Sequence, residues 1–416
     1  MKLLANTLLV LIASVACLFL AEGALAVLGH PSGPVRPVAH APNLSELRSS
    51  VEYRYQFNTN SQGLRYREVP LEPAPGTRRV LVLGDSYTEG WGVETPQRFS
   101  NRLESFFRAN GRPVEFINGG LAASSPADYA RLLDNVGLKY QPDAVLICVF
   151  ANDIVGSSDT LSPEQASAAS PGIKGVVKRL LPRSYTLVDG VRQQWLEPHV
   201  IRTRDFIHDA TTQARRRGVS EARIQAWQDS LPPEIVEVIN SDGFHVKTIG
   251  IGLLEPEYWA DSLQVDSPRD QRKWQNMVLA LDAIAQTTAR ENIEVALVYL
   301  PVHFQYDPGT HSADHAAVQT GTVVRREWLQ GVSEEERLLQ AWAARHKVPF
   351  MSLTESFRSA IPSEELLDFP LDGHWTPAGH AVAAKALEQW LQEDRVFSVT
   401  SRVNDEEGWQ DLALAN

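Results

Sequence analysis

The stretch Val80-Leu-Val-Leu-Gly-Asp-Ser-Tyr-Thr-Glu-Gly90 decides the fold. Its first four residues are all apolar, which is typical of a parallel strand buried on both faces. Gly84 ends the run and places Ser86 just beyond the carboxyl end of that strand, where open α/β sheets bind their ligands. A serine on a sharp strand-to-helix turn can present its hydroxyl to a substrate, and its own N–H can point at a substrate oxygen. The alternative is a Gly-Asp-Ser turn that only ends a strand.

From Arg79 onward, short apolar runs alternate with segments of helical periodicity such as Phe99, Leu103 and Phe106. This alternation predicts a parallel sheet with helices on both faces. Right-handed crossovers make a doubly wound, flavodoxin-like α/β/α sandwich with five parallel strands the simplest topology. The runs expected to form the strands are Val80–Leu83, Val114–Asn118, Ala144–Phe150, Val295–Leu300 and Val348–Ser352.

Several predicted helices share one start signal, a capping hydroxyl followed by a proline at the first helical position. The signal occurs at Thr95-Pro96, Ser125-Pro126, Ser267-Pro268 and Thr376-Pro377. Ser333 and Glu336 add the spacing of a capping box.

One connection is too long for a simple sandwich. Between Ile154 and about Asp266 no strand–helix unit is recognisable, and a structureless loop of that length is improbable inside a compact domain. We therefore expect a helical insertion after the third strand, at 154–266. The chain then divides into a signal segment (1–28), a proline-rich spacer and lead-in (29–78), a main domain (79–395) and an acidic tail (396–416).

The N-terminal segment predicts export from the cytoplasm. Residues Leu3 to Ala21 carry no charge, a length close to the roughly 20 residues that cross a membrane as a helix. An uncleaved signal anchor would leave the main domain on the periplasmic face of the inner membrane. A signal peptide cleaved after Ala24-Leu-Ala26 would release it instead. A lipoprotein signal ending at Cys17 is a third alternative, but Ser14 stands where leucine is usual.

The composition excludes other classes. The 416 residues carry a net charge of −12, which argues against a nucleic-acid partner. The two cysteines, Cys17 and Cys148, are not expected to pair. No Cys/His cluster has zinc spacing, and neither a P-loop nor a Rossmann glycine fingerprint is present. We expect neither a metal nor a cofactor, and the oligomeric state stays open.

Ester cleavage needs a base for the serine hydroxyl and an acid that orients this base. His374 is the best candidate base, because its loop follows the fifth strand and precedes a predicted helix. Asp372 lies two residues earlier, and a bend at Gly373 would bring its carboxylate to the imidazole. The alternatives are a histidine that caps a helix and an aspartate that only forms a turn.

Two further strand ends offer donors for an oxyanion. Asn152 follows the third strand, where its side-chain amide would serve, although an Asn-Asp turn is the simpler interpretation. Asn118-Gly-Gly-Leu-Ala-Ala-Ser-Ser125 follows the second strand, and its glycines allow close backbone approach.

Gly84-Asp-Ser86, the glycine-rich turn, Asn152-Asp153 and Asp372-Gly-His374 occur in that order. Together they resemble the sequence blocks of the SGNH/GDSL hydrolase family, over roughly Arg79 to Arg395 apart from the insertion. The resemblance implies a five-stranded α/β/α sandwich with a Ser-His-Asp arrangement. It also implies an oxyanion hole formed by the Ser86 N–H, a second-block N–H and the Asn152 amide. The lead-in Asn58-Thr-Asn-Ser-Gln-Gly-Leu-Arg65 is similar to that of exported, membrane-anchored members.

Two departures from the family pattern matter. Ala123 stands where the second block has glycine, so that Gly120 is the alternative donor. Asp372 lies two residues before His374 rather than the three of many members. The Asp-x-His-Trp sequence also resembles bacterial polysaccharide O-acetyltransferases of this fold.

We therefore expect an extracytoplasmic serine ester hydrolase that cleaves O-acyl esters, with small acyl groups on envelope glycans as the first substrate class. An O-acyltransferase using the same residues, or a binding module without catalysis, are the alternatives.

Overall fold

The computed structural model describes residues 2–28, 38–50, 52–156, 206–231, 252–307, 325–361, 365–370 and 372–393, with a few single positions between them. The chain divides into two compact units, Met1–Pro37 with Asp159–Asp205 and Val38–Ser158 with Phe206–Asn416. Most of the expected proline-rich stretch, much of the insertion and nearly all of the acidic tail lie outside the described residues. The division of the chain proposed from the sequence therefore stays a prediction.

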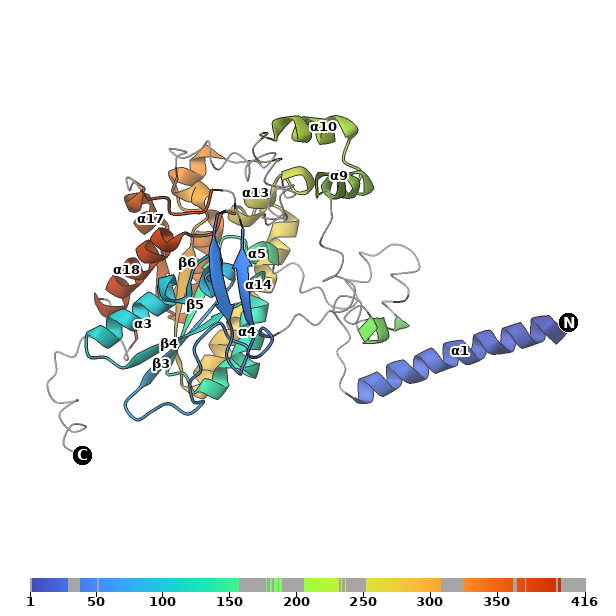
Figure 1. The fold of residues 1–416 in the computed structure, drawn as a ribbon, viewed down its shortest axis with the longest axis horizontal. Coiled ribbons are helices and arrows are strands. Elements are labelled where there is room, and N and C mark those ends of the chain that lie inside the picture. Colours follow the sequence, from blue (N-terminus) through green and yellow to red (C-terminus); the bar gives the residue numbers. More distant parts are fainter. Residues whose placement is uncertain are drawn as a thin grey trace. The chain divides into compact units, whose positions relative to one another are not determined.

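The second unit is built on a five-stranded parallel sheet in the order β4-β3-β5-β6-β7 (Figure 1). Strand β3 lies between β4 and β5, so the chain reverses its direction of winding there, and the crevice at its carboxyl end is a topological switch point. The strands are β3 (Arg78–Gly84), β4 (Val114–Gly120), β5 (Ala144–Phe150), β6 (Glu294–Leu300) and β7 (Phe350–Ser352).

The predicted α/β/α sandwich is confirmed, and each apolar run supplies a strand. All of β5 is buried, as its uninterrupted apolar sequence requires. The fifth strand is shorter than expected. Val348 does not pair in the sheet, because its N–H donates to the Ala343 carbonyl 2.9 Å away and closes the end of the preceding helix.

Helices cover both faces of the sheet (Figure 1). Helix α3 packs against α18, and α4 packs against α14. The described helices of this unit are α2 (Ser86–Glu89), α3 (Phe99–Ala109), α4 (Pro126–Asn135), α5 (Asp153–Gly156), α9 (Phe206–Arg216), α10 (Glu221–Ser230), α13 (Tyr258–Leu263), α14 (Pro268–Glu291), α16 (Glu334–His346), α17 (Thr354–Ala360) and α18 (Pro377–Glu393). Short 3-10 helices are η1 (Thr95–Gln97), η2 (Gly137–Tyr140), η5 (His303–Gln305) and η6 (Arg326–Leu329).

The predicted caps are confirmed at Ser125, Ser267 and Ser333. At the start of α18, the Thr376 hydroxyl accepts from the Ala378 N–H at 3.2 Å. The prediction at Thr95-Pro96 is wrong. Glu94 caps a single 3-10 turn there, and α3 begins only at Phe99, because Arg98 between them has extended backbone.

The lead-in forms a two-stranded antiparallel hairpin of β1 (Ser45–Ser49) and β2 (Arg54–Asn58). Tyr55 and Phe57 are buried and alternate with the more exposed Arg54 and Gln56, as in a strand with one buried face. After the hairpin, the buried Arg65 guanidinium donates to the carbonyl groups of Gly90 at 2.5 Å and Val93 at 2.7 Å. The lead-in is thereby tied to the turn that follows α2.

The described residues between β5 and β6 are mostly helical, as expected for the insertion. Helices α9 and α10 share a small core that includes Ala214, Ile224 and Trp227. Helix α13 instead joins the main core, where the Trp259 ring meets the Phe150 ring edge-on, with 6.3 Å between ring centroids. The insertion therefore reaches the carboxyl end of β5.

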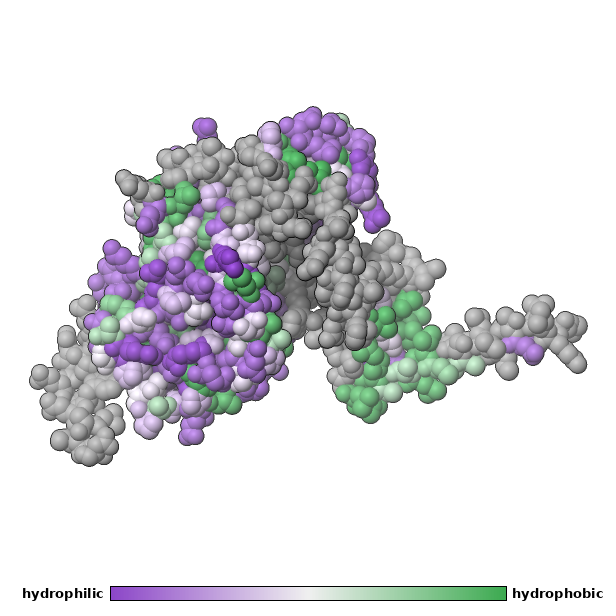
Figure 2. All heavy atoms as spheres, in the orientation of Figure 1, coloured by the Kyte–Doolittle hydropathy of each residue, from purple (hydrophilic) through white to green (hydrophobic). Residues whose placement is uncertain are grey.

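The first unit contains α1 (Lys2–Val27). Apolar side chains gather on the C-terminal part of this helix (Figure 2), and its exposed members include Leu18, Phe19, Leu20 and Val27. Glu22 accepts hydrogen bonds from the N–H groups of Arg183 and Ser184 at 2.9 and 2.8 Å. In the part of the chain that the structure describes, no helix is both long enough and apolar enough to span a membrane.

Candidate active site

Ser86 is the first residue of α2, directly beyond the carboxyl end of β3. The turn before it needs glycine, since a Cβ at Gly84 would lie 2.0 Å from the Thr88 hydroxyl oxygen. The Asp85 carboxylate caps α2 by accepting from the Tyr87 N–H at 2.9 Å. N–H groups in the first turn of a helix have no hydrogen-bond partner within the helix. The Ser86 N–H can therefore donate to a substrate oxygen.

His374 is brought to this serine from a position 288 residues further along the chain. Its Nε2 lies 2.7 Å from Ser86 Oγ. The loop bends at Gly373, which has φ +85°, and the Tyr87 hydroxyl donates to the Gly373 carbonyl at 2.7 Å. The imidazole lies beside the Tyr87 and Trp91 rings, with 4.9 and 5.7 Å between ring centroids. The loop and the imidazole are therefore fixed from α2 and the turn that follows it.

Asp372 completes a hydrogen-bonded chain. Its Oδ1 contacts the other ring nitrogen of His374, Nδ1. Its Oδ2 accepts from the Tyr53 hydroxyl at 2.9 Å and from Trp91 Nε1 at 3.3 Å. Its backbone N–H donates to the Glu52 carboxylate at 2.8 Å. Ser86, His374 and Asp372 thus form a hydrogen-bonded row, and further hydrogen bonds fix the position of Asp372 on the side away from His374.

Sequence reasoning missed these supporting residues. Tyr53 precedes β2 in the lead-in, and its hydroxyl reaches Asp372 across 319 positions in the sequence. Trp91 directly follows the stretch Val80 to Gly90, and its Nε1 also donates to the Tyr53 hydroxyl at 2.7 Å. The available signals were their positions. Trp91 directly follows the motif that contains Ser86, and Tyr53 lies in the lead-in.

The electrostatic environment suits a histidine base. Burial alone would lower the pKa of His374, but the neighbouring Asp372 carboxylate raises it above the ordinary value of 6.5. Burial also raises the pKa of Asp85 to about 6, although the bond from the Tyr87 N–H opposes this rise. The imidazole is therefore a stronger base than a free histidine.

The turn after β4 holds one of the expected oxyanion donors in an unusual conformation. Ala123 has φ +59°, in the left-handed region that favours glycine. This explains physically why glycine is expected at this position. The turn is fixed from one side by buried Glu89, which accepts from the Ala122 N–H at 3.0 Å.

The alternative donor expected from the sequence is Gly120. Its N–H already donates to the Asn118 side-chain oxygen at 3.1 Å. A Cβ at Gly120 would lie 2.1 Å from the Glu89 backbone nitrogen, so glycine is needed here for close packing of β4 against α2.

Asn152 lies where it was expected, directly beyond the carboxyl end of β5. Its backbone carbonyl accepts from the Val155 N–H at 3.0 Å, so it does form a turn. Its side chain is half-buried and lies near Tyr258 of the insertion, where it opposes the rise that burial causes in the pKa of this tyrosine. The side chain of the next residue, Asp153, stabilises the end of β5 by accepting a hydrogen bond from the Phe150 N–H at 3.0 Å.

Ser86 with the two loops after β4 and β5 therefore lies at one edge of the sheet. A hydroxyl aligned with a histidine and a carboxylate at the switch point of an α/β/α sandwich is the arrangement of an acyl-transfer enzyme of the serine type. Within the described ranges, no group of three or more His, Cys, Asp or Glu side chains is placed to hold a metal ion.

Comparison with known proteins agrees with this class. The GDSL-like lipase/acylhydrolase family model matches residues 82–382, most of the chain, so the protein belongs to this family and is a carboxylic-ester hydrolase. This family assignment confirms the resemblance seen in the sequence. No curated protein matches the chain.

Solved structures with a similar fold have low identity to the chain. TesA is 13% identical, with 76% of this chain and 99% of TesA covered and a TM-score of 0.35. A catalytic mutant of Axe2, an acetylxylan esterase from Geobacillus stearothermophilus, is 12% identical, with 75% and 93% covered and a TM-score of 0.36. A lipase/acylhydrolase from Enterococcus faecalis is 12% identical, with 76% and 95% covered and a TM-score of 0.35. These values are too low to transfer a substrate.

Proposed function

We propose that this ester hydrolase works through Ser86 as nucleophile, His374 as general base and Asp372 as the acid that orients the histidine. The observation that carries the proposal is the continuous chain of contacts from Ser86 Oγ through both ring nitrogens of His374 to Asp372. Two observations support these roles: Ser86 Oγ and His374 Nε2 lie 2.7 Å apart, and the pKa of His374 is raised.

In this mechanism Ser86 Oγ attacks the acyl carbonyl carbon while its proton passes to His374 Nε2. The imidazolium is stabilised by Asp372 and then gives the proton to the oxygen of the leaving alcohol, which leaves an acyl group on Ser86. A water molecule loses a proton to His374 and attacks the acyl carbon. The proton returns to Ser86 Oγ as the carboxylic acid leaves, so that the enzyme is restored.

The oxyanion would be bound by the Ser86 N–H, the Ala123 N–H and the Asn152 amide. These groups belong to the three loops that follow β3, β4 and β5, which are neighbours in the sheet. Each well-placed donor contributes about 10²–10³-fold in rate.

The site of action would be outside the cytoplasm, and the substrates would be O-acyl esters on envelope glycans. The support for export is the uncharged segment Leu3 to Ala21, which would act as a signal anchor or as a cleaved signal peptide. The choice of glycans follows from that compartment.

The proposal is tested by aryl-ester hydrolysis with the full chain, wild type beside Ser86→Ala. We expect turnover that is lost in Ser86→Ala and varies as the acyl chain is lengthened from acetyl to octanoyl. Equal rates in the two proteins would refute Ser86 as nucleophile. Product analysis with added glycan alcohols separates hydrolysis, which yields free acid, from transfer, which yields an acylated glycan.

A further inference from the structure

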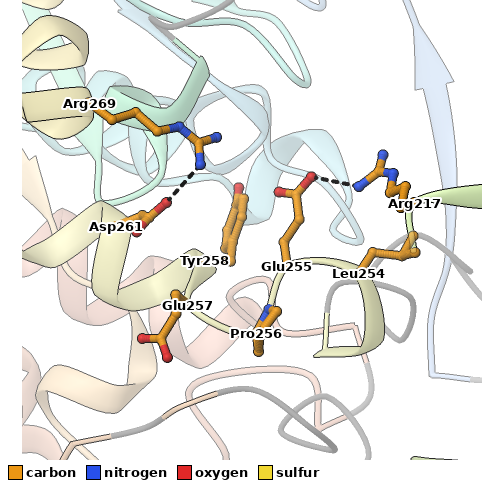
Figure 3. Close-up of a pocket in the computed structure, with 8 residues that line it drawn as sticks. All are labelled: Arg217, Leu254, Glu255, Pro256, Glu257, Tyr258, Asp261 and Arg269. Atoms are coloured by element: carbon orange, nitrogen blue, oxygen red, sulfur yellow. Dashed lines mark hydrogen bonds and ion pairs between the residues drawn. The ribbon is translucent and has the colours of Figure 1, made fainter. Parts of the chain in front are cut away.

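A pocket of about 370 Å³ lies where the insertion meets the start of α14, beside α13 (Figure 3). Its polar lining consists of two guanidinium groups, three carboxylates and one tyrosine: Arg217, Arg269, Glu255, Glu257, Asp261 and Tyr258. We call it the α13 pocket. Its volume falls at the lower end of the roughly 300–1,000 Å³ typical of small-molecule sites.

The α13 pocket adjoins the proposed active site through Tyr258. This residue lines the pocket, and its hydroxyl lies near enough to the Asn152 side chain, the proposed oxyanion donor, for Asn152 to oppose the rise that burial causes in the pKa of Tyr258. The next residue, Trp259, contacts Phe150 at the end of β5, so α13 is docked on the edge of the sheet that carries Ser86. A group bound in the pocket would therefore lie next to the ester being cleaved.

The ion pairs in the pocket contribute little to the fold. Arg217 and Glu255 lie 3.2 Å apart with about half of each side chain exposed, 51% and 48%. Arg269 and Asp261 are 3.7 Å apart, and the arginine is 68% exposed. Exposed pairs of this kind stabilise a protein by only about 0–1 kcal/mol. Arg217, Glu255 and Arg269 can therefore exchange partners for a ligand at small cost, whereas Asp261 is also paired with the buried Lys273, 3.2 Å away.

The chemistry of the lining selects one kind of ligand. A fatty acyl chain would strip water from charged groups without replacing their hydrogen bonds, which is unfavourable. An anionic ligand would meet more carboxylates than guanidinium groups. Hydroxyl groups both donate and accept, so neighbouring hydroxyls can satisfy a carboxylate and a guanidinium together.

We propose that the α13 pocket binds the alcohol part of the ester, a neutral polyhydroxylated group of the size of a sugar residue. This inference rests on the proposed function, since it assigns the leaving group of the same reaction. The insertion, rather than the sheet, then determines which alcohol the enzyme accepts.

The test compares two acetate esters, 4-nitrophenyl acetate and a mono-acetylated methyl glycoside, in the full chain. The double variant Arg217→Gln/Glu255→Gln removes one charged pair of the pocket. Arg290→Gln/Glu291→Gln removes an exposed pair of similar length, 3.3 Å, at the far end of α14, and serves as the matched control. Thermal unfolding of each variant shows that it is folded.

We expect the ratio of kcat/KM for the sugar ester to that for the aryl ester to fall about tenfold in the pocket variant, mainly through KM. The control should keep the wild-type ratio. A pocket variant whose ratio stays within about twofold of wild type would overturn the inference while leaving Ser86-dependent hydrolysis intact.

A second measurement separates this inference from the proposed function. Binding of the free methyl glycoside to Ser86→Ala is followed by saturation-transfer NMR, with and without the pocket substitutions. Binding that is lost only with the pocket substitutions supports the assignment even if Ser86 proves not to be the nucleophile. Equal binding in both proteins, or none in either, overturns it.

Discussion

Replacing Asp372 by Asn keeps the size of the side chain but removes its charge, and the surrounding donors determine how the new amide must point. Trp91 Nε1 can only donate, and the Tyr53 hydroxyl already accepts from it and donates to Asp372 Oδ2. The amide oxygen must therefore face these two donors. This orientation turns the NH₂ group toward His374 Nδ1.

The consequence is a histidine in the wrong tautomer. An NH₂ group beside Nδ1 requires Nδ1 to accept, so the proton moves to Nε2, the atom 2.7 Å from Ser86 Oγ. His374 can then no longer take the serine proton. The same substitution in a serine-protease triad lowers kcat by about 10⁴-fold, which corresponds to about 5 kcal/mol in the activation barrier.

The pH profile gives a second readout with a defined sign. His374 must be neutral to act as a base, so kcat/KM of the wild type rises as the pH increases through the raised pKa of His374. Without the Asp372 carboxylate, the effect of burial is opposed only by Asp85 and Glu89. The pKa of His374 therefore falls, and the residual activity rises at lower pH than in the wild type.

The assay is steady-state hydrolysis of 4-nitrophenyl acetate between pH 5 and 9. Asp229→Asn, the same chemical change on the exposed face of α10, is the control and should behave as wild type. If Asp372→Asn keeps kcat within tenfold of the wild type, while His374→Ala is inactive, Asp372 is a turn residue and our reasoning about its role is refuted.

Three other substitutions test single contacts. Tyr53→Phe removes a hydrogen-bond donor 2.9 Å from Asp372 Oδ2. Because a hydrogen bond to a charged group contributes about 1.5–3 kcal/mol, kcat for the aryl ester should fall about tenfold. An unchanged kcat would show that Trp91 alone is sufficient to hold the Asp372 carboxylate. Ala123 has a left-handed backbone, which costs about 1–2 kcal/mol for a residue with a Cβ, and Ala123→Gly removes this cost. Glycine also gives the unfolded chain more conformational entropy, which lowers the stability by about 0.4–1 kcal/mol. Urea unfolding should therefore show a free energy of unfolding about 0.5 kcal/mol higher than in the wild type, and a lower value would contradict the assigned conformation. Burial raises the pKa of Asp368 to about 8 from an ordinary 3.8, so the folded state holds this proton more tightly and stability should fall as the pH rises between these values. Asp368→Asn stays neutral, and urea unfolding at pH 5 and 8.5 should show a smaller fall than in the wild type; an equal fall would place the titrating group elsewhere.

The sheet was predictable because its strands are buried on both faces. A strand such as β5 has no exposed position, so its sequence is an uninterrupted apolar run whose ends can be read directly. Val348 shows the limit of this reasoning. It is apolar and adjacent to β7, but it is used to close α16, and a short apolar run does not distinguish these uses.

The contacts of the site were predictable where the topology alone brings residues together. Ser86 and His374 each follow a strand of the same parallel sheet, and the carboxyl ends of such strands lie at one edge. Tyr53 and Tyr258 belong to no strand of that sheet. Their positions depend on how the lead-in and the insertion pack, which local patterns do not encode.

Gly120 illustrates why a glycine-rich turn is ambiguous in a sequence. A glycine can be required for a free N–H, for a left-handed backbone or for close packing, and these needs leave the same letter in the sequence. In this turn the packing role falls to Gly120, while the left-handed position is occupied by Ala123.

The central claim is that Ser86 is activated by His374, and covalent labelling tests it most directly. The full chain is treated with a fluorophosphonate that reacts with activated serines, digested and analysed by mass spectrometry. We predict a single adduct on the peptide that contains Ser86, formed far more slowly in His374→Ala. An adduct on another residue, or labelling of Ser86 at the same rate without His374, would contradict the proposed mechanism.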